Sequence, residues 1–364
     1  MDIAAHLITR LPLAVLLTLM AWSVAVPAAE LGLPEVTHPA HNPATPAKIA
    51  LGQQLFHDPR LSADGSVSCA TCHVPEQAFT DGLSVAEGIG GQRGTRNTPT
   101  LLNVTFERSF FWDGRRATLE AQAQDPFIHP REHGLKDHAQ LTAIIRRDPA
   151  YRRAFKHAFS IRPAAISVAH VAQAIASFER TLVAANSAFD RYYYGGEKQA
   201  LSASALRGLE IFQHRAQCTQ CHVIGETSAL LTDHQYHSLG VGYHKIEPRL
   251  AELTLRLAQR PVPALDHSIL GEAEIAELGR FAVTLNPQDI AKFRTPSLRN
   301  VALTAPYMHD GSVATLEEVI DLELYYRGVA SGRPLVLTPQ EKSDLLAFLK
   351  ALTGATAQTW VKRR

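Results

Sequence analysis

Two short stretches of the sequence place cysteine and histidine at a spacing that can do chemistry. Both are Cys-x-x-Cys-His motifs, and they read Cys69-Ala70-Thr71-Cys72-His73 and Cys218-Thr219-Gln220-Cys221-His222. All four cysteines of the chain lie in these motifs. Two thiols at this spacing can form thioether bonds to the vinyl groups of one porphyrin, and the adjoining histidine then reaches the iron. The motifs therefore predict two covalently bound c-type haems, with His73 and His222 as proximal iron ligands.

Zinc and thiol redox chemistry also use Cys-x-x-Cys pairs. Two such pairs could bind zinc, and one pair could form a thioredoxin-like redox centre. Neither alternative gives a role to the histidine that follows each pair, and a redox pair is expected once rather than twice. The haem interpretation explains the histidine and uses every cysteine, so we favour it.

Residues 1–28 have the pattern of a secretory signal peptide. Arg10 precedes an apolar run from Leu11 to Val26, and small residues follow up to Ala28, where we expect cleavage. This run of about 16 residues contains Pro12 and is shorter than the roughly 20 residues that a membrane-spanning helix needs, which argues against a membrane anchor. We therefore predict a periplasmic protein with no membrane span in its mature form.

The composition is that of an ordinary globular protein, with 46% hydrophobic and 20% charged residues. A length of 364 residues suits either two domains of similar size or one large domain. Lys and Arg total 36 and Asp and Glu total 35, which leaves no strong field for binding nucleic-acid phosphates. A nucleic-acid-binding role is therefore excluded.

The segments that follow the two haem motifs resemble each other at one constant offset. Residues 96–104 resemble residues 294–301, and at the same offset residues 112–120 match residues 309–317. This pattern indicates an internal duplication with one haem in each copy.

Helical patterns dominate the chain between and after these segments. Apolar residues recur every three or four positions from Val168 to Leu182, which predicts a helix with one buried face. Ser202 and Thr338 are expected to cap two further helices. The predicted fold is mostly α, with two tandem cytochrome-c-like haem domains at residues 29–190 and 191–364. We also expect the C-terminal helix to pack back on the first domain.

With these elements in place, the sequence resembles the bacterial di-haem cytochrome c peroxidase and MauG family over essentially the whole mature chain. The resemblance rests on both haem motifs and on RNTPTLLNV, FFWDGRRATLE and RTPSLRNVALTAPYMHDGSVATLEEVID. In that family the N-terminal haem reacts with peroxide and the C-terminal haem passes electrons. A tryptophan and a calcium ion lie between the two haems.

The resemblance implies roles for three residues of the first domain. Trp112 corresponds to the aromatic residue between the haems, and Gln122 and Glu132 correspond to the distal Gln and Glu of the family. A carboxylate over an open iron can move a proton between the two oxygens of a peroxide, and an amide can hydrogen-bond the bound oxygen. Without that correspondence, Glu132 would be a solvated carboxylate in the charged loop HPREHG.

The calcium position of the family would take three oxygen donors from this chain. They are the side chain of Asn97 and the backbone carbonyls of Thr304 and Pro306. Taken alone, Asn97 suits an ordinary turn equally well. Calcium is therefore an optional third cofactor.

The first haem lacks one ligand that conventional peroxidases of the family carry. Those enzymes have a removable distal histidine in the loop after the proximal histidine, and here Ile89 holds that position. No histidine occurs between His73 and His129. We therefore predict that the iron of the first haem has no distal protein ligand even before reduction. In this respect the chain is similar to the MauG branch.

The distal ligand of the second haem is Met in the peroxidases and Tyr in MauG-like members. Its position counted from His309 falls on Glu323, which is a poor ligand, but two extra residues in DLELYYRG bring Tyr325 into register. We predict Tyr325 as the ligand and Tyr326 as the alternative. Met308 is a third choice that better suits packing. A Tyr ligand would lower the potential of this haem, whereas Met would raise it.

Three functions fit this pattern. The first is a peroxidase that reduces H2O2 with electrons from a small soluble redox protein, either a c-type cytochrome or a cupredoxin. The second is a MauG-like oxidase that withdraws electrons from residues of a protein substrate. The third is a non-enzymatic electron carrier. An open first haem beside Gln122 and Glu132 argues against the carrier, so we predict an oxidoreductase that acts on peroxide as acceptor, of the cytochrome-c peroxidase type.

Overall fold

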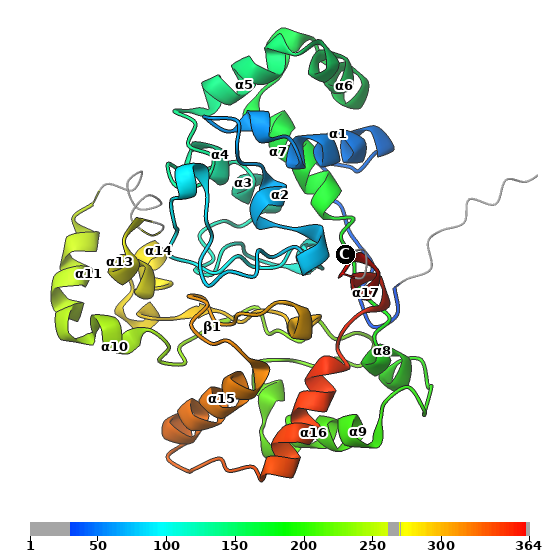
Figure 1. Cartoon of the computed structure of the whole chain (residues 1–364), viewed down its shortest axis with the longest axis vertical. Helices are drawn as coiled ribbons and strands as arrows, with labels where there is room; N and C mark the ends of the chain where they lie inside the picture. The colour runs from blue at the N-terminus through cyan, green and yellow to red at the C-terminus, as the bar shows by residue number, and fades with distance from the viewer. Residues whose placement is uncertain (1–29, 261–268, 270, 362–364) are drawn as a thin grey trace, which may run out of the picture.

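The computed structural model describes residues 30–260, 269 and 271–361, and helices dominate this part of the chain (Figure 1). The predicted signal peptide, residues 1–28, lies outside the described residues. In the described part, one sheet is found, in which β1 (Tyr236–His237) pairs antiparallel with β2 (Phe293–Arg294). The prediction of a mostly α fold is therefore confirmed. Among the described helices, none is both long and apolar enough to cross a membrane.

The upper part of the molecule in Figure 1 is built around one hydrophobic core. Its helices are α1 (Pro46–Phe56), α2 (Cys69–Cys72), α3 (Leu119–Gln122), α4 (Asp125–Ile128), α5 (His138–Arg147), α6 (Pro149–Phe159) and α7 (Val168–Glu179). The predicted stripe on α7 is buried at Val171, Ile175 and Phe178. Gly52 of α1 lets the two helices approach closely, because a Cβ atom there would lie 1.9 Å from the carbonyl oxygen of Ala174.

The lower part has a second core. Its helices are α8 (Ala188–Tyr193), α9 (Ala203–Glu210), the single π turn η6 (Ile211–Arg215), α15 (Leu316–Ser331) and α16 (Pro339–Lys350). The predicted caps are confirmed, because the side chains of Ser202 and Thr338 each accept a backbone hydrogen bond from the first turn of their helices. Gly208 allows α9 and α16 to cross as closely as α1 and α7, since a Cβ atom there would lie 2.0 Å from the carbonyl oxygen of Asp344.

A third, smaller core lies in the segment of the second half that connects β1 to β2. Its helices are α10 (Tyr243–Ile246), α11 (Leu250–Ala258), α13 (Ala273–Glu277) and α14 (Phe281–Thr284). This segment packs on the first half of the chain. Arg280 donates hydrogen bonds to the carbonyl oxygens of Asp113 and Gly114 at 2.9 and 2.8 Å, and Thr95 donates to the carbonyl oxygen of Ile269 at 2.8 Å.

Short helices and one final helix complete the chain. The 3₁₀ helices are η1 (Pro59–Leu61), η2 (Pro75–Gln77), η3 (Ile89–Gly91), η4 (Val104–Phe106), η5 (Pro163–Ala165), η7 (Cys218–Gln220), η8 (Glu247–Arg249), η10 (Pro287–Asp289) and η11 (Val301–Leu303). The final helix is α17 (Ala355–Val361), and its Ala357 is buried in the core of the first half. Arg299 forms a buried ion pair at 2.8 Å with Asp190 of α8 and also donates a hydrogen bond to the carbonyl oxygen of Gly32, which ties the start of the described chain to the second half.

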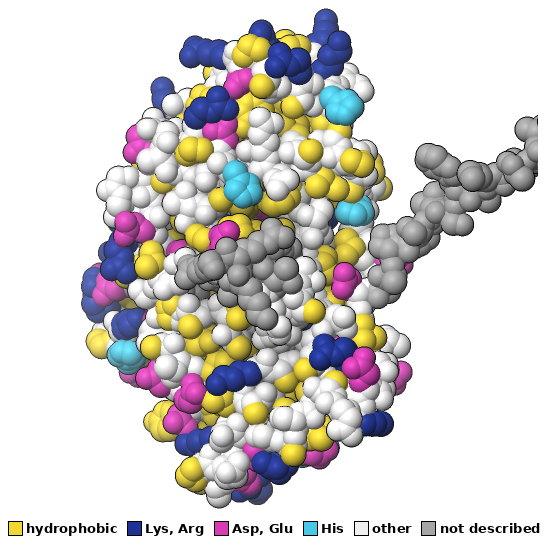
Figure 2. Space-filling model, turned by 45° about the vertical axis from the view of Figure 1, so that its right-hand side comes forward, with side chains coloured by type: hydrophobic (Ala, Val, Ile, Leu, Met, Phe, Trp, Pro, Cys, Tyr) yellow, Lys and Arg dark blue, Asp and Glu magenta, His cyan; other side chains and the backbone are white. Residues whose placement is uncertain are grey.

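Charged side chains are distributed unevenly over the surface. On the face shown in Figure 2, basic and acidic side chains are mixed, except at the upper end, where basic ones gather. In Figure 1 this end is formed by α5 and α6. Their exposed basic residues are Arg146, Arg147, Arg152, Arg153, Lys156 and His157. The near balance of charges in the composition therefore conceals one basic end.

Candidate active site

The first haem motif is carried by α2 and the residue after it. The backbone N–H of Ser68 donates to the hydroxyl of Thr71 at 3.0 Å, which fixes the start of this short helix. The Nδ1 atom of His73 donates to the carbonyl oxygen of Phe79 at 3.0 Å, because a carbonyl can only accept. Burial lowers the pKa of His73, so the ring is neutral and its Nε2 atom carries the lone pair. This is the form in which an imidazole binds iron.

The second haem motif repeats this arrangement. The Nδ1 atom of His222 donates to the carbonyl oxygen of Leu231 at 2.8 Å. Burial lowers the pKa of His222 to about 4, so this ring is also neutral. The sequence identified both histidines but gave no signal for the carbonyl oxygens that fix their tautomers, because Phe79 and Leu231 act through their backbones.

The cysteines fit thioether attachment. All four thiols are free rather than paired in disulfides. Cys69, Cys72 and His73 line one side of a cavity that encloses about 1400 Å³, counting the part open to solvent. This cavity offers room beside the first motif for a group as large as a porphyrin.

Buried arginines give an independent test of whether a haem fits this cavity. Arg96 and Arg294 both line it. Within the described residues, Nε and Nη1 of Arg96 and Nε of Arg294 are buried without a hydrogen-bond partner. A buried donor without a partner is costly, and a haem brings two propionate carboxylates that guanidinium groups bind well. The residues present therefore fit a haem attached at Cys69 and Cys72.

The two predicted distal residues line this same cavity with His73. Gln122 is the last residue of α3, a helix whose start is capped by Thr118. Glu132 lies in a turn in which its backbone N–H donates to the carbonyl oxygen of His129 at 3.1 Å. The structure therefore brings Gln122 and Glu132, which are close in sequence, together with the distant His73.

The side chain of Glu132 is set up for proton transfer. Burial raises the pKa of Glu132 to about 7, because removal from water disfavours the charged carboxylate, while the nearby cation of Arg115 opposes that rise. A carboxyl group with a pKa near neutrality can both accept and return a proton at ordinary pH.

Trp112 also lines the cavity, on a loop between the two halves of the molecule. Its indole Nε1 donates to the carbonyl oxygen of Asn97 at 2.9 Å. Its own carbonyl oxygen accepts from the backbone N–H of Arg294 at 2.8 Å. The indole is thus held by the first half, and the backbone of the same residue is bound to β2 of the second half.

Among the predicted calcium residues, Asn97 is bound to the chain segment that follows Pro306. The backbone N–H of Asn97 donates to the carbonyl oxygen of His309 at 2.9 Å, which brings Asn97 close to the loop that contains Thr304 and Pro306. The side-chain amide of Asn97 donates to the carbonyl oxygen of Leu83 at 2.9 Å. The calcium site stays a prediction.

The predicted distal ligand of the second haem is largely exposed to solvent. Tyr325 lies on α15 with 65% of its surface exposed. Arg327 holds this helix to the second motif by donating to the carbonyl oxygen of Gln217 at 2.7 Å. Burial raises the pKa of Glu323, which is one turn before Arg327 on the same face. Tyr326 turns toward the loop after β1, since a Cβ atom on Gly240 would lie 2.6 Å from its ring.

A buried polar cluster near Asn97 was missed by the sequence analysis. His309 donates to the carboxylate of Glu277 at 2.7 Å and stacks on Phe293 with the ring centroids 3.6 Å apart. Lys245 contacts the carboxylates of Glu277 and Asp310 at 3.2 and 2.8 Å. Because this ammonium group already bridges the two carboxylates, we place no metal ion in the cluster. Glu277 and Lys245 come from the segment with its own core, so no local pattern could have linked them to His309.

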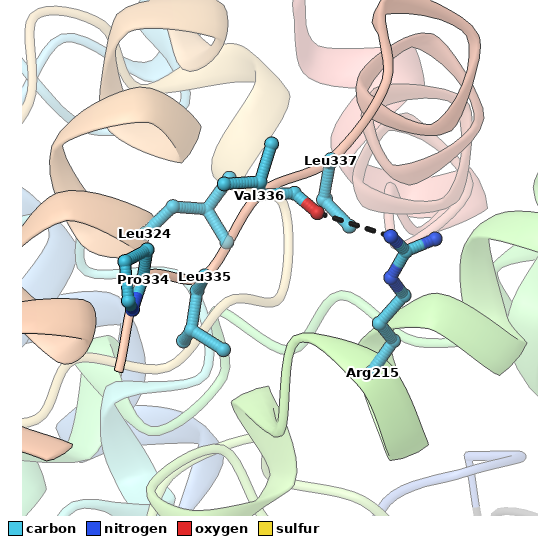
Figure 3. Close-up of a pocket in the computed structure, with 6 residues that line it drawn as sticks. All are labelled: Arg215, Leu324, Pro334, Leu335, Val336 and Leu337. Carbon is cyan, nitrogen blue, oxygen red and sulfur yellow. Dashed lines mark hydrogen bonds between the residues drawn. The ribbon is translucent and has the colours of Figure 1, made fainter. Parts of the chain in front are cut away.

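A separate hollow lies beside the end of α15 (Figure 3). It encloses about 510 Å³ and is lined by Arg215 and by Leu324, Pro334, Leu335, Val336 and Leu337. The guanidinium of Arg215 donates to the carbonyl oxygen of Val336 at 3.2 Å. None of the residues predicted to bind haem lines this hollow, so it lies outside the candidate site.

Comparisons with known proteins identify the relatives of this chain. The family model described as di-haem cytochrome c peroxidase matches residues 46–199. The chain is 38% identical over 334 residues to the cytochrome-c peroxidase IdrP1 of Pseudomonas sp. (strain SCT), a match that covers 88% of this chain and 84% of that protein. It is 36% identical over 332 residues to the methylamine utilization protein MauG of Methylorubrum extorquens, covering 88% of this chain and 82% of that one.

Among solved structures, the fold is similar to a MauG-like protein associated with microbial copper homeostasis. The TM-score is 0.73 at 35% sequence identity, over 93% of this chain and 97% of that one. The di-haem peroxidase BthA from Burkholderia thailandensis gives a TM-score of 0.66 at 25% identity, over 86% and 87% of the two chains. Because relatives from both the peroxidase and the MauG branch match most of its length, this chain belongs to the di-haem cytochrome c peroxidase and MauG family, and it carries two c-type haems.

Proposed function

We propose that this protein is a di-haem peroxidase that reduces H2O2 at its N-terminal haem, with electrons relayed through the C-terminal haem from a small soluble redox protein. The observation that carries this proposal is the single cavity that Glu132 shares with Gln122, Trp112 and the proximal His73. The peroxidase names of several relatives support the same activity class.

The protein's own residues would divide the work of peroxide reduction. The haem supplies the iron at which peroxide is bound and reduced. Glu132 accepts a proton from one peroxide oxygen and returns it to the other, so that water can leave. The side-chain amide of Gln122 donates a hydrogen bond that orients the peroxide. Trp112 provides an aromatic path for electrons that arrive from the second half of the chain.

Our assignment of the two haems follows the two halves of the chain. Residues 29–190 form the peroxidatic domain and residues 191–364 form the electron-transfer domain, and both descend from one duplicated unit. The equivalent close approaches at Gly52 and Gly208 support that duplication. The predicted signal peptide at residues 1–28 supports a periplasmic location for the mature protein, where its electron donor would also be found.

The proposal also names ligands for calcium and for the second haem. We place calcium at Asn97, Thr304 and Pro306. For the second haem we retain a tyrosine of α15 as distal ligand. Tyr326 is better placed than Tyr325 because Tyr325 is 65% exposed, whereas the ring of Tyr326 packs against the loop at Gly240.

A MauG-like oxidase of a protein substrate is the second candidate. Ile89 favours it, because this residue occupies the position of the removable histidine and its backbone N–H donates to the carbonyl oxygen of Glu132 at 2.9 Å. The match to MauG over 88% of the chain is the reason to test both.

The decisive experiment is the variant Glu132→Gln, mixed with H2O2 in a stopped-flow spectrometer. This substitution keeps the size of the side chain but removes its ability to accept and return a proton. We expect the reaction at the first haem to slow by roughly 10²–10⁴-fold, the usual range for general acid–base catalysis. Glu197→Gln is the matched control, because the side chain of Glu197 is 59% exposed. Wild-type kinetics in Glu132→Gln would overturn the catalytic assignment.

The same instrument separates the two candidate functions. A peroxidase should oxidise a reduced small c-type cytochrome continuously when H2O2 is added. Fast reaction of the first haem without continuous oxidation of any such donor would instead favour the protein oxidase.

A further inference from the structure

We propose that residues 86–94 form a rigid strap that holds Glu132 at its catalytic position, and that Gly88 is a positioning residue for this carboxyl group. The inference rests on the proposed role of Glu132. It gives a new task to the very loop that carries a removable ligand in conventional members of the family.

The strap is rigid because it is a tight hairpin bound to itself. The backbone N–H of Gly94 donates to the carbonyl oxygen of Ala86 at 2.8 Å, and that of Gly88 donates to Gln92 at 2.9 Å. The chain reverses through Gly90 and Gly91, whose φ angles of 62° and 71° favour glycine. A hairpin closed in this way has little freedom to move its contact face.

The contact face of the strap is bound to the loop that carries Glu132. The backbone N–H of Ile89 donates to the carbonyl oxygen of Glu132 at 2.9 Å. In the opposite direction, the guanidinium of Arg131 donates to the carbonyl oxygen of Arg93 at 2.9 Å. These two bonds flank the peptide unit that joins residues 131 and 132, so they fix the backbone from which the carboxyl side chain extends.

Gly88 makes this contact possible. A Cβ atom at residue 88 would lie 2.1 Å from the carbonyl oxygen of Arg131 and 2.8 Å from the Cα atom of Glu132. Both neighbours are backbone atoms, which cannot rotate away as the end of a side chain can. The φ angle of −114° is not in the left-handed region, so glycine is needed here for space rather than for conformation. Any larger residue must therefore displace the loop at residues 131–132.

A displacement of this loop should change the pKa of Glu132. Its pKa is raised to about 7 by burial, and the charged groups that act on it are Arg115, which lowers the pKa, and Asp125, which raises it. If the loop moves outward, water reaches the carboxyl group and its pKa falls toward the ordinary value. A change that merely loosened the fold elsewhere would not produce that specific shift.

The test is the holoprotein variant Gly88→Ala, compared with Gly271→Ala. An added Cβ atom at Gly271 meets nothing within 4 Å, so this variant is the matched control. For Gly88→Ala we expect the rate of reaction with H2O2 to fall by roughly 10–100-fold, since a misplacement of about 1 Å can cost that much. The pH at which this rate is half-maximal should also move downward from its wild-type value. The control should match wild type in both measurements.

A second pair of variants keeps the inference testable if Gly88→Ala does not fold. Ile89→Pro removes the N–H that donates to Glu132, while Ile89→Ala removes only the side chain. Loss of rate with a lowered pH midpoint in the proline variant alone supports the strap. A wild-type rate and midpoint in Gly88→Ala, alongside a slow Glu132→Gln, would overturn the strap and leave the proposed function intact. Wild-type behaviour in both would show that Glu132 is not catalytic, and both proposals would then fail.

Discussion

The indole Nε1 of Trp112 donates a hydrogen bond to the backbone carbonyl oxygen of Asn97 over 2.9 Å. The backbone N–H of Asn97 in turn donates to His309 of the second half. The aromatic residue proposed to carry electrons is therefore held by a residue that itself connects the two halves. This linkage sets the orientation of the indole as well as its position.

Replacing Trp112 tests the electron path without touching the proton-transfer group. Trp112→Phe keeps an aromatic ring but loses the N–H that binds Asn97. The first haem should still react with H2O2 in a single turnover, whereas steady-state turnover with a reduced c-type cytochrome should fall sharply. Stopped-flow and steady-state assays of the same preparation measure the two steps. Tyr193→Phe, at an aromatic residue that is 41% exposed, is the control.

The raised pKa of Glu132 predicts a dependence of both rate and stability on pH. A base must be ionised to accept a proton, so the rate of reaction with H2O2 should rise with pH and be half-maximal near the pKa of about 7. Stability should change in the opposite direction. The folded pKa exceeds the unfolded value of 4.5, so the folded state binds more protons between these pH values and becomes less stable as the pH rises through this range.

The variant Glu132→Gln should therefore be more stable than wild type at pH 8 and equally stable below pH 4. The difference at pH 8 should be about 3 kcal/mol, from the size of the pKa shift. Chemical denaturation at both pH values measures it. An equal free energy of unfolding of the two proteins at pH 8 would show that the ionised carboxylate of Glu132 does not destabilise the folded state.

The spin states of the two haems test the role of residue 89. Because Ile89 offers no ligand atom and its backbone is bound to Glu132, the untreated ferric protein should show one high-spin and one low-spin haem in its electron paramagnetic resonance spectrum. Two low-spin haems, with peroxide turnover that begins only after half-reduction, would contradict an open first haem and indicate a conventional peroxidase.

Local features of the fold were predictable from the sequence. Ser202 and Thr338 cap α9 and α16, and each hydroxyl accepts a hydrogen bond from a backbone N–H only three residues later. Because this contact is local, the neighbouring residues are enough to predict it. The buried face of α7 followed from helical periodicity, and Val171 and Ile175 are buried as expected. His73 and His222 were also predictable, because the haem motif is a local pattern of five residues.

Features that depend on distant contacts were not predictable. The cluster of His309, Glu277 and Lys245 joins a turn to a separately folded segment, and no spacing along the chain encodes that contact. The direction of Tyr325 could not be found by counting. Residues two positions apart on a helix differ by about 200° around its axis. A two-residue shift in the alignment can therefore select a side chain that points to solvent.

The buried ion pair between Arg180 and Glu120 should support the distal residue Gln122. Arg180 donates to Glu120 at 2.7 Å, and both side chains are at most 10% exposed. Arg180→Ala would leave a buried carboxylate without its cation, which costs about 3–5 kcal/mol in comparable cases. Because Glu120 lies on α3 two residues before Gln122, the variant should also slow the reaction with H2O2. Replacing the exposed Arg249, whose ion pairs lie at the surface, should leave the free energy of unfolding nearly unchanged.

The last prediction concerns the distal ligand of the second haem. Tyr326→Phe removes one phenol oxygen with almost no change in volume, so it should alter the low-spin signal and raise the potential of that haem while both haems remain attached. Tyr325→Phe should leave both unchanged, because its side chain is 65% exposed. Each tyrosine thus serves as the matched control for the other.

The outcome of this pair decides how α15 sits against the haem. A change in Tyr325→Phe alone would mean that the helix turns about its axis when the haem is attached, since Tyr325 is now exposed and neighbouring positions on a helix are about 100° apart. No change in either variant would exclude both phenols and leave Glu323 and Met308. Glu323 would then be tested first, because it lies on the face of α15 that Arg327 holds against the second motif and because burial already raises its pKa. A carboxylate and a thioether are distinguished directly, since Met raises the potential of a haem and Glu323→Gln would leave a Met-ligated signal intact.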